Sequence, residues 1–337
     1  MDPERPRPPA IACCDSSRSE SEPSPSVIVT EPTPTTMSHV SRWRGFEAMF
    51  SIGRGQFGVV FLMKHPDGRK VVDKRLGLTG MSEKERTATS QEIDVLRKLE
   101  HEHIVTLFDD FIDRNGPEEV LHIIMEYCGG GSLAEQVEQQ QQLKRHFDPG
   151  RVRRWLVQLA SALAHVHSHR VLHRDLKTAN IFLTEDDGPR GGLDVRLGDF
   201  GISRLLSSQT SLAASCVGTP YYLSPELVAG HGYDDRADVW SLGVVAYELL
   251  ALRRPFTGES IGQLAMRITT AKAKPLPSST PPDLQEVVGL LIQKEAQLRP
   301  TATALLAHPL VKGWAMQQAA TNAAADDDPA NAAGNAE

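Results

Sequence analysis

One segment constrains this chain more than any other: the run HRDLKTAN at residues 173–180, followed by DFG at residues 199–201. In a fixed order it supplies a carboxylate that can hold a hydroxyl group, a lysine for a phosphate, and two oxygen ligands for a metal ion. Phosphoryl transfer needs these groups because its transition state is mostly charge to be neutralised and atoms to be aligned. The pattern therefore predicts phosphoryl transfer.

Each polar residue of this segment has an expected task. Asp175 would accept the hydrogen bond of a substrate hydroxyl and orient it for in-line attack. Lys177 would neutralise charge on the transferred group. Asn180 and Asp199 would ligate Mg²⁺, which prefers oxygen ligands.

A glycine-rich run, GRGQFGVV at residues 53–60, fits the pattern G-x-G-x-x-G-x-V. Such a run also occurs in dinucleotide-binding folds, and Asp73 lies 20 residues after Gly53, where those folds place a ribose-binding acid. In those folds, however, the loop opens a helix. Here Val59, Val60 and Phe61 continue as a strand, which favours a flap that closes over phosphates.

Lys74 ends the next predicted strand, from which it can reach the α- and β-phosphates of a nucleotide. Glu92, on the predicted helix that follows, is the acid that would pair with Lys74 and hold it in place. Asp73 is unusual inside a strand, and we expect it to face solvent.

The chain predicts a small β-rich lobe followed by a larger helical lobe, an α+β fold. Residues 58–63 and 70–74 flank the turn sequence HPDG and predict a hairpin. Ser82 and Glu85 form a capping-box pattern that opens a helix. Residues 151–167 predict another helix, and most later segments are helical.

Both ends of the chain have a different composition from its centre. Residues 1–42 are rich in Pro, Ser, Thr and Glu, and residues 315–337 in Ala, Asn and Asp, so we expect two disordered tails. Most of the net charge of −7 lies in these ends. Acidic and basic residues nearly balance between them, which argues against nucleic acid or an anionic membrane as the main partner.

The four cysteines show neither a disulfide framework nor a zinc pattern, which fits a reducing compartment. The N-terminal residues lack the apolar stretch of a secretory signal. The longest apolar run, residues 239–252, is too short to span a bilayer. We therefore expect a soluble, intracellular, cytoplasmic protein that does not bind a membrane. The C-terminal tail has no heptad pattern, so oligomerisation is not indicated.

Residues 46 to about 310 resemble a eukaryotic Ser/Thr protein kinase, specifically of the NIMA-related (Nek) family. Besides the motifs above, the resemblance rests on IIMEYC at residues 123–128, LGDFG at 197–201 and CVGTPYYLSPE at 216–226. It implies a bilobal kinase domain at 46–311, with an N-lobe at about 46–125, a hinge at 126–131 and a C-lobe at 132–311. It also implies ATP and Mg²⁺ as cofactors and Ser/Thr hydroxyls of proteins as substrates, with cytoskeletal or nuclear association as a further possibility.

The resemblance assigns further site residues. Met125 would be the gatekeeper, Val60, Val72 and Phe182 would enclose adenine, and Leu96, Leu107, His173 and Phe200 would stack as a spine. Glu226 and Arg299 would form a buried ion pair, and Asp238 would brace the catalytic loop. The residues expected to contact ATP are Ile52, Gly53, Gly55, Gly58, Val60, Val72, Lys74, Met125, Glu126, Cys128 and Phe182.

Two departures from the family pattern concern the nucleotide pocket. Ser132 stands where the family usually has an acid that contacts ribose, and Val72 replaces a smaller residue. The catalytic groups are all present, although a catalytically weak pseudokinase scaffold is the alternative.

Regulation by phosphorylation is also expected. Lys177 and Thr219 resemble those of Ser/Thr kinases, and Arg174 those of kinases that use a phosphorylated activation segment. We expect Ser215 to be the activating site, where a phosphate would pair with Arg174. Ser207, Ser208, Thr210 and Ser211 are competing sites.

Overall fold

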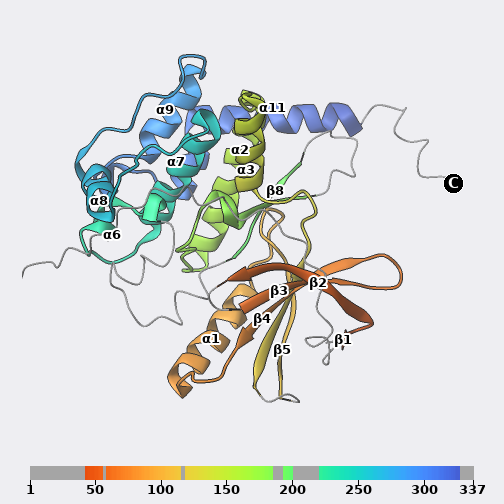
Figure 1. Ribbon diagram of the computed structural model, residues 1–337. Helices are drawn as coiled ribbons and strands as arrows, with labels where there is room; N and C mark the ends of the chain where they lie inside the picture. Colours follow the sequence, from red (N-terminus) through yellow and green to blue (C-terminus); the bar gives the residue numbers. More distant parts are fainter. Residues whose placement is uncertain (1–41, 56–57, 115–117, 185–192, 200–219, 327–337) are drawn as a thin grey trace, which may run out of the picture.

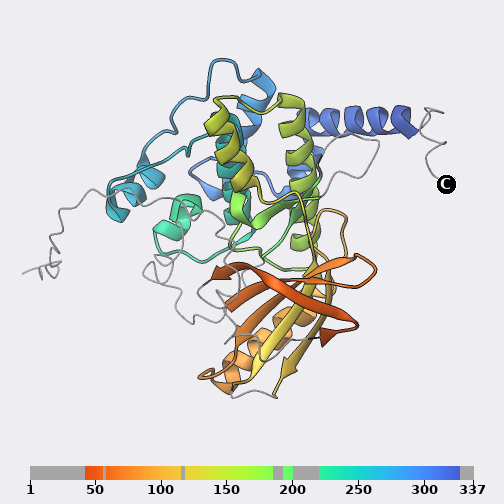
Figure 2. The same cartoon turned by 45° about the vertical axis from the view of Figure 1, so that its right-hand side comes forward.

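The computed structural model describes residues 42–55, 58–114, 118–184, 193–199 and 220–326. A β-sheet with one helix forms a smaller N-terminal lobe, and helices form most of a larger C-terminal lobe (Figures 1 and 2). The predicted α+β, bilobal fold is confirmed.

The N-lobe contains one antiparallel sheet with the strand order β1-β2-β3-β4-β6-β5. Its strands are β1 (Arg42–Trp43), β2 (Phe46–Gly55), β3 (Gly58–Lys64), β4 (Lys70–Gly77), β5 (Leu107–Asp113) and β6 (Val120–Glu126). The predicted hairpin is β3 and β4. Its turn is closed by the His65 N–H, which donates to the Arg69 carbonyl at 2.9 Å, and Gly68 takes a positive φ of 96° there.

Helix α1 (Glu83–Leu96) lies against this sheet (Figure 1). The predicted capping box is present, since the Ser82 side chain accepts from the Glu85 N–H and the Glu85 side chain accepts from the Ser82 N–H. These bonds satisfy backbone donors that the first turn of a helix leaves unpaired. Ile93 is buried on the inner side of α1 and joins Leu76 and Ile123 in a core under the sheet.

Asp73 is fully buried, so the expectation that it faces solvent is wrong. Its Oδ1 lies 3.0 Å from His122 Nδ1, and its Oδ2 accepts from Arg75 Nε at 2.7 Å. Strand alternation places Asp73 on the same face as Val71, which packs with Phe46 in an apolar cluster. That face is covered, so the carboxylate is satisfied by side chains instead of water.

The C-lobe is built around α3 and α7. Its elements are α2 (Leu133–Leu143), α3 (Pro149–Ser168), α6 (Pro225–Val228), α7 (Asp235–Ala251), α8 (Ile261–Thr270), α9 (Pro282–Leu291), α10 (Ala302–Ala307) and α11 (Pro309–Asp326), with short 3₁₀ turns η2 (Thr178–Asn180), η3 (Pro220–Tyr222) and η4 (Ala296–Leu298). The predicted apolar face of α3 is buried, including Trp155, Leu159 and Leu163. Nearly every residue of α7 is buried, which makes it the centre of the lobe.

A two-stranded hairpin, β7 (Ile181–Leu183) and β8 (Val195–Leu197), lies between α3 and the N-lobe (Figure 1). The Val105 N–H donates to the Leu197 carbonyl at 2.9 Å, and the Leu197 N–H donates to the His103 carbonyl at 2.8 Å. These bonds join the segment after α1 to the strand that leads to Asp199.

The C-terminal region differs from the expectation. Helix α11 continues to Asp326, so the prediction that residues 315–337 lack structure is wrong for residues 315–326. The helix that contains the buried Trp314 continues through this segment, because alanine has the highest helix propensity. Low-complexity composition by itself did not indicate a helix. In the part of the chain that the structure describes, no helix is both long enough and apolar enough to cross a membrane.

Candidate active site

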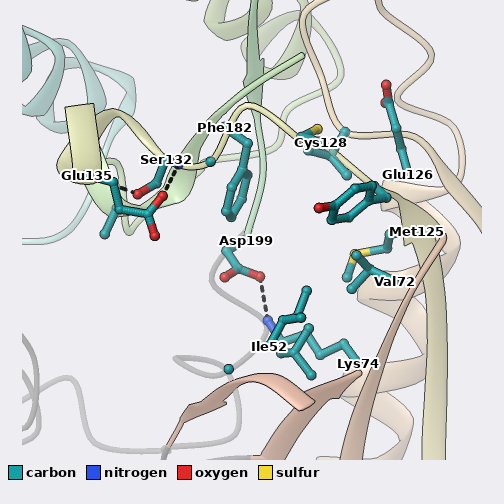
Figure 3. Close-up of a pocket in the computed structure, with 17 residues that line it drawn as sticks. Ile52, Val72, Lys74, Met125, Glu126, Cys128, Ser132, Glu135, Phe182 and Asp199 are labelled. Carbon is teal, nitrogen blue, oxygen red and sulfur yellow. Dashed lines mark hydrogen bonds and ion pairs between the residues drawn. The ribbon is translucent and has the colours of Figure 1, made fainter. Parts of the chain in front are cut away.

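A cavity of about 420 Å³ lies between the two lobes, below the sheet and above β7. Most of the residues expected to contact ATP line it. They are Ile52, Gly53, Val60, Val72, Lys74, Met125, Glu126, Cys128 and Phe182, joined by Asp199, Ser132 and Glu135 (Figure 3). Apolar side chains from both lobes face one another across the cavity, which suits a flat, mainly apolar ring.

Gly55 and Gly58 flank the tip of the predicted flap and are not among the lining residues. Gly58 has a different reason to be glycine: a Cβ there would lie 1.8 Å from the Arg75 carbonyl oxygen of β4. The close approach of the two strands therefore excludes any side chain at this position. A Cβ on Gly53 would meet only Val60, at an ordinary 3.8 Å.

Lys74 reaches across the cavity, where its Nζ donates to Asp199 Oδ1 at 2.6 Å (Figure 3). Burial would raise the pKa of the Asp199 carboxyl, but the charge and hydrogen bond of Lys74 outweigh it, so this pKa lies below its usual value. Glu92 belongs to α1, but its side chain lies outside the described residues. The expected Lys74–Glu92 pair therefore stays a prediction.

Asp175, Lys177 and Asn180 converge as expected. Lys177 Nζ donates to Asp175 Oδ2 at 2.8 Å, and Asn180 Nδ2 donates to the same oxygen at 2.9 Å. The backbone N–H of Gly198 donates to the Asn180 carbonyl at 3.0 Å, which places Asp199 beside the catalytic loop. Two residues here, Arg174 and Asp199, have positive φ values of 65° and 50°, a strained conformation for a side-chain-bearing residue.

Asp238, at the start of α7, holds the backbone of the catalytic loop. Its fully buried carboxylate accepts from the His173 N–H at 2.9 Å and the Arg174 N–H at 3.0 Å. This geometry confirms the bracing role expected from the resemblance. Sequence reasoning missed two more partners, His167 Nε2 at 2.8 Å and the Tyr233 hydroxyl at 2.6 Å. Neither belongs to a motif, so only the fold could have brought them here.

Burial also changes the pKa of a cysteine, Cys128, on the hinge side of the cavity. Burial, assisted by the Glu126 charge, raises the pKa of the Cys128 thiol to about 12. The Glu126 carboxylate itself turns away to accept from the Thr106 N–H at 3.1 Å and from Arg196 Nε at 3.2 Å. This leaves the hinge backbone and the thiol beside the pocket.

Ser132 and Glu135 form a capping box at the start of α2, on the edge of the cavity (Figure 3). Glu135 Oε2 accepts from the Ser132 N–H at 2.8 Å. Gly131 makes room for this carboxylate, since a Cβ there would lie 2.3 Å from Glu135 Oε2. Sequence reasoning missed Glu135, although Ser132-x-x-Glu135 repeats the pattern recognised at Ser82.

A small second cavity lies behind Lys74. Its lining residues include Leu96, Leu107, Met125 and Gly198. Leu96 and Leu107 are the first two residues of the expected spine, and His173 Nε2 donates to the Gly198 carbonyl at 3.0 Å. Phe200, the remaining member of the expected stack, lies outside the described residues.

The expected regulatory residues are only partly described. Ser215 and Thr219, with the competing sites at 207–211, lie outside the described residues. Arg174 is described, beside Asp175. Downstream, Arg299 is almost fully buried and forms the expected pair with Glu226, at 2.6 Å from Nη2 to Oε2.

In the comparison with known protein families, residues 46–311 match the protein kinase domain. The chain is 36% identical over 268 residues to the serine/threonine-protein kinase Nek5 of Homo sapiens, a match that covers 79% of this chain and 36% of Nek5. It is 38% identical over 277 residues to Homo sapiens Nek2, covering 80% of this chain and 60% of Nek2. It is 36% identical over 270 residues to the probable serine/threonine-protein kinase nek2 of Dictyostelium discoideum, covering 79% and 62%. The chain thus spans about a third to three-fifths of these relatives' length.

Proposed function

Because this chain belongs to the protein kinase domain family, with a domain of the NIMA-related type, we propose that it transfers the γ-phosphate of ATP to serine and threonine hydroxyls of proteins. The observation that carries the proposal is the proximity of two lysine–carboxylate pairs. Lys74 and Asp199 line the cavity, and the bond from the Gly198 N–H to the Asn180 carbonyl brings Asp199 beside the loop that carries the second pair, Lys177 and Asp175. The first pair suits the nucleotide and the second the attacking hydroxyl.

ATP would occupy the cavity between the lobes. Val60 and Val72 from the sheet and Phe182 from β7 would enclose adenine, and the backbone of Glu126 and Cys128 would recognise its edge. Lys74 would hold phosphate oxygens, for which it has to exchange its present contact with Asp199. Glu135 would accept a hydrogen bond from a ribose hydroxyl, in place of the acid that is missing at position 132.

The residues present fit a magnesium ion. The amide nitrogen of Asn180 donates to Asp175, so its carbonyl oxygen remains to bind a cation, and Asp199 supplies a carboxylate. Among the described residues no group of three or more His, Cys, Asp or Glu side chains could hold a metal. That agrees with Mg²⁺, which keeps water and phosphate ligands beside one or two carboxylates. When bound, Mg²⁺ neutralises charge on the phosphates.

Asp175 would accept the hydrogen bond of the substrate hydroxyl and receive its proton. A bond then forms from that oxygen to the γ-phosphorus, and the bond from this phosphorus to the β–γ bridging oxygen breaks, which releases ADP. Lys177, 2.8 Å from Asp175, would neutralise charge on the group in transfer. Asp238 keeps the loop that carries both residues in place.

An autophosphorylation assay with a mass readout tests the proposal. The parent protein, incubated with ATP and Mg²⁺, should gain phosphate on serine or threonine. Lys74→Met matches the length of lysine without its charge, and should fold with the parent's thermal transition yet gain no phosphate. If the parent gains no phosphate and phosphorylates no protein, a pseudokinase scaffold is the better description. If Lys74→Met does not fold, Lys74 has a structural role instead.

We also propose an intracellular, cytoplasmic location and proteins as substrates, without a membrane or nucleic-acid partner. The near balance of charge in the centre of the chain supports this part of the proposal. Fractionation of cells that express a tagged full chain tests the location.

A further inference from the structure

Three loops meet at the C-terminal end of α2. Gln141 Nε2 donates to the Leu252 carbonyl at 2.7 Å, and His146 Nδ1 lies 3.1 Å from the Leu250 carbonyl, which joins the end of α2 to the end of α7. Arg253 Nη2 donates to the Pro275 carbonyl at 2.8 Å, which joins the end of α7 to the loop after α8. This region lies on the side of the C-lobe far from the sheet (Figures 1 and 2).

Basic side chains outnumber acidic ones on the three loops, whose two carboxylates are those of Asp148 and Glu259. We call five of these basic side chains the basic surface: Lys144, Arg145, Arg253, Lys272 and Lys274, all exposed. Within the described part of the chain, none of the five takes part in an ion pair. Leu143 lies beside them with 54% of its surface exposed.

Two carboxylates close to these loops have partners of their own. Glu248 accepts from the Tyr222 hydroxyl and lies 3.7 Å from Arg254, and Asp148 caps α3 by accepting from the Arg151 N–H at 2.9 Å. In the described part of the chain neither pairs with the basic surface, whose five cations outnumber the negative charges on the three loops. Adjacent like charges repel one another, which a bound anionic partner would relieve.

The basic surface lies at a defined distance from the cavity. Helix α2 follows its cap residue Ser132 on the cavity edge, and its 11 residues end at the basic surface. At 1.5 Å per residue the helix spans about 16 Å. An extended polypeptide, at about 3.3 Å per residue, covers this distance with about five residues.

We propose that the basic surface docks an acidic segment of the protein substrate, at least about five residues away from the phosphorylated hydroxyl. This inference rests on the proposed kinase activity. Leu143 favours a polypeptide over a nucleic acid, because an acidic segment can place an apolar side chain on it among the charged ones. Helix α11, as far as Asp326, leads away from this surface (Figures 1 and 2).

The test compares synthetic substrates that share one serine acceptor sequence. A spacer of five to ten Gly/Ser residues links the acceptor, on either side, to a block of six Asp/Glu or of six Gln/Asn residues. For the parent we expect KM to be about tenfold lower with the acidic block, the sum of several weak exposed pairs, and kcat to be similar. The advantage should shrink as salt rises from about 0.05 to about 0.5 M.

Charge reversal locates the effect. The triple variant Lys144→Glu, Arg145→Glu and Lys274→Glu should lose the advantage, and the milder Lys→Gln and Arg→Gln set should reduce it. Lys312→Glu, an exposed lysine of α11, is the matched control and should keep it. Equal KM for both blocks in the parent, or an advantage that survives charge reversal, overturns the proposal.

Binding without nucleotide separates this inference from the proposed function. Fluorescence anisotropy of a labelled acidic block should show binding to the parent and Lys312→Glu, and none to the triple variant. If the acidic block binds but the protein phosphorylates nothing, the basic surface still binds acidic segments and the proposed kinase activity is wrong. If the acidic block binds more tightly after residues 321–337 are removed, the chain's own tail occupies the basic surface. If a labelled oligonucleotide binds more strongly than the acidic block, the occupant is a nucleic acid. Either outcome overturns substrate docking.

Discussion

Two lysines in the active site each contact one carboxylate, and the two contacts have different consequences. Lys74 contacts Asp199, whose pKa it holds down, and Lys177 contacts Asp175. Asp175 also accepts a hydrogen bond from the side-chain amide of Asn180, so two neighbours set the orientation of its carboxylate. In the proposed function Asp199 acts on the phosphates and Asp175 on the attacking hydroxyl, so their loss should affect different steps.

We predict that Asp175→Asn retains ATP binding and loses turnover by about 10²- to 10⁴-fold, because the change removes the proton acceptor and leaves the cavity intact. Asp199→Asn should weaken Mg-ATP binding as well as turnover, since it removes charge from a metal ligand. Nucleotide affinity by calorimetry and single-turnover phosphorylation measure both. Comparable turnover in Asp175→Asn and the parent would show that the assigned role is wrong.

Cys128 offers a pH-dependent measurement in the same cavity. Its thiol pKa is raised to about 12, mainly by burial, so little thiolate forms near neutral pH. The alkylation rate of Cys128 by iodoacetamide, followed by peptide mass, should rise about tenfold per pH unit up to about pH 10 without levelling off. Glutathione, an exposed thiol, should level off earlier in the same series. ATP should slow the reaction, because the thiol lines the cavity.

At the scale of single elements, α2 and β4 show what local patterns can and cannot reveal. The capping boxes at Ser82 and Ser132 have the same sequence pattern and the same geometry. Only the structure shows that the second one lies on the cavity, because that depends on where the hinge turns. Alternation in β4 correctly separates Lys74 from Asp73. It cannot show that His122, 49 residues away, covers Asp73.

We predict that Glu135→Gln raises the KM for ATP by about tenfold, the effect of losing one charged hydrogen bond of about 1.4 kcal/mol, with kcat little changed. Glutamine can still cap α2, so the helix should remain. Adding Ser132→Asp should restore the KM, since aspartate caps a helix and returns the family's acid. The matched control is Glu85→Gln in the other capping box, which should leave the KM unchanged. An unaltered KM in Glu135→Gln would remove Glu135 from ribose binding.

At the scale of the whole molecule, the sequence predicted the two lobes and the groups that meet between them, because the kinase motifs occur in a fixed order. It missed what long-range packing decides. His167 and Tyr233 reach Asp238 only because α3 and α7 pack together, and α11 continues because Trp314 anchors its start. The basic surface was also invisible, since its five cations come from three separate loops.

The buried pair of Arg299 and Glu226 provides a test at this scale. Arg299 is 1% exposed and also donates to the carbonyls of Gln293, Arg236 and Lys294. From the end of η4 it therefore holds together the first turn of α6, the start of α7 and the segment after α9. Arg299→Ala leaves a buried carboxylate and several carbonyls unpaired, and should reduce the free energy of unfolding by about 3–5 kcal/mol. Urea unfolding measures the loss.

The same pair makes this loss depend on pH. Burial opposes ionisation of Glu226, but the hydrogen bonds and charge of Arg299 outweigh it, so its pKa in the folded state is lowered from the ordinary 4.5. A carboxyl group whose pKa is lower in the folded than in the unfolded protein stabilises the fold at pH values above its unfolded-state pKa. This stabilisation is lost as the pH falls through the folded-state pKa. The difference in unfolding free energy between the parent and Arg299→Ala should therefore be full at pH 6 and narrow below about pH 4.5. Arg69→Ala, which breaks the exposed pair with Asp67, is the control and should leave the free energy of unfolding nearly unchanged, because water screens an exposed pair. The prediction is wrong if Arg299→Ala lowers the free energy of unfolding as little as the control does, or if its effect grows in acid. Either result would mean that the pair does not hold this part of the lobe together.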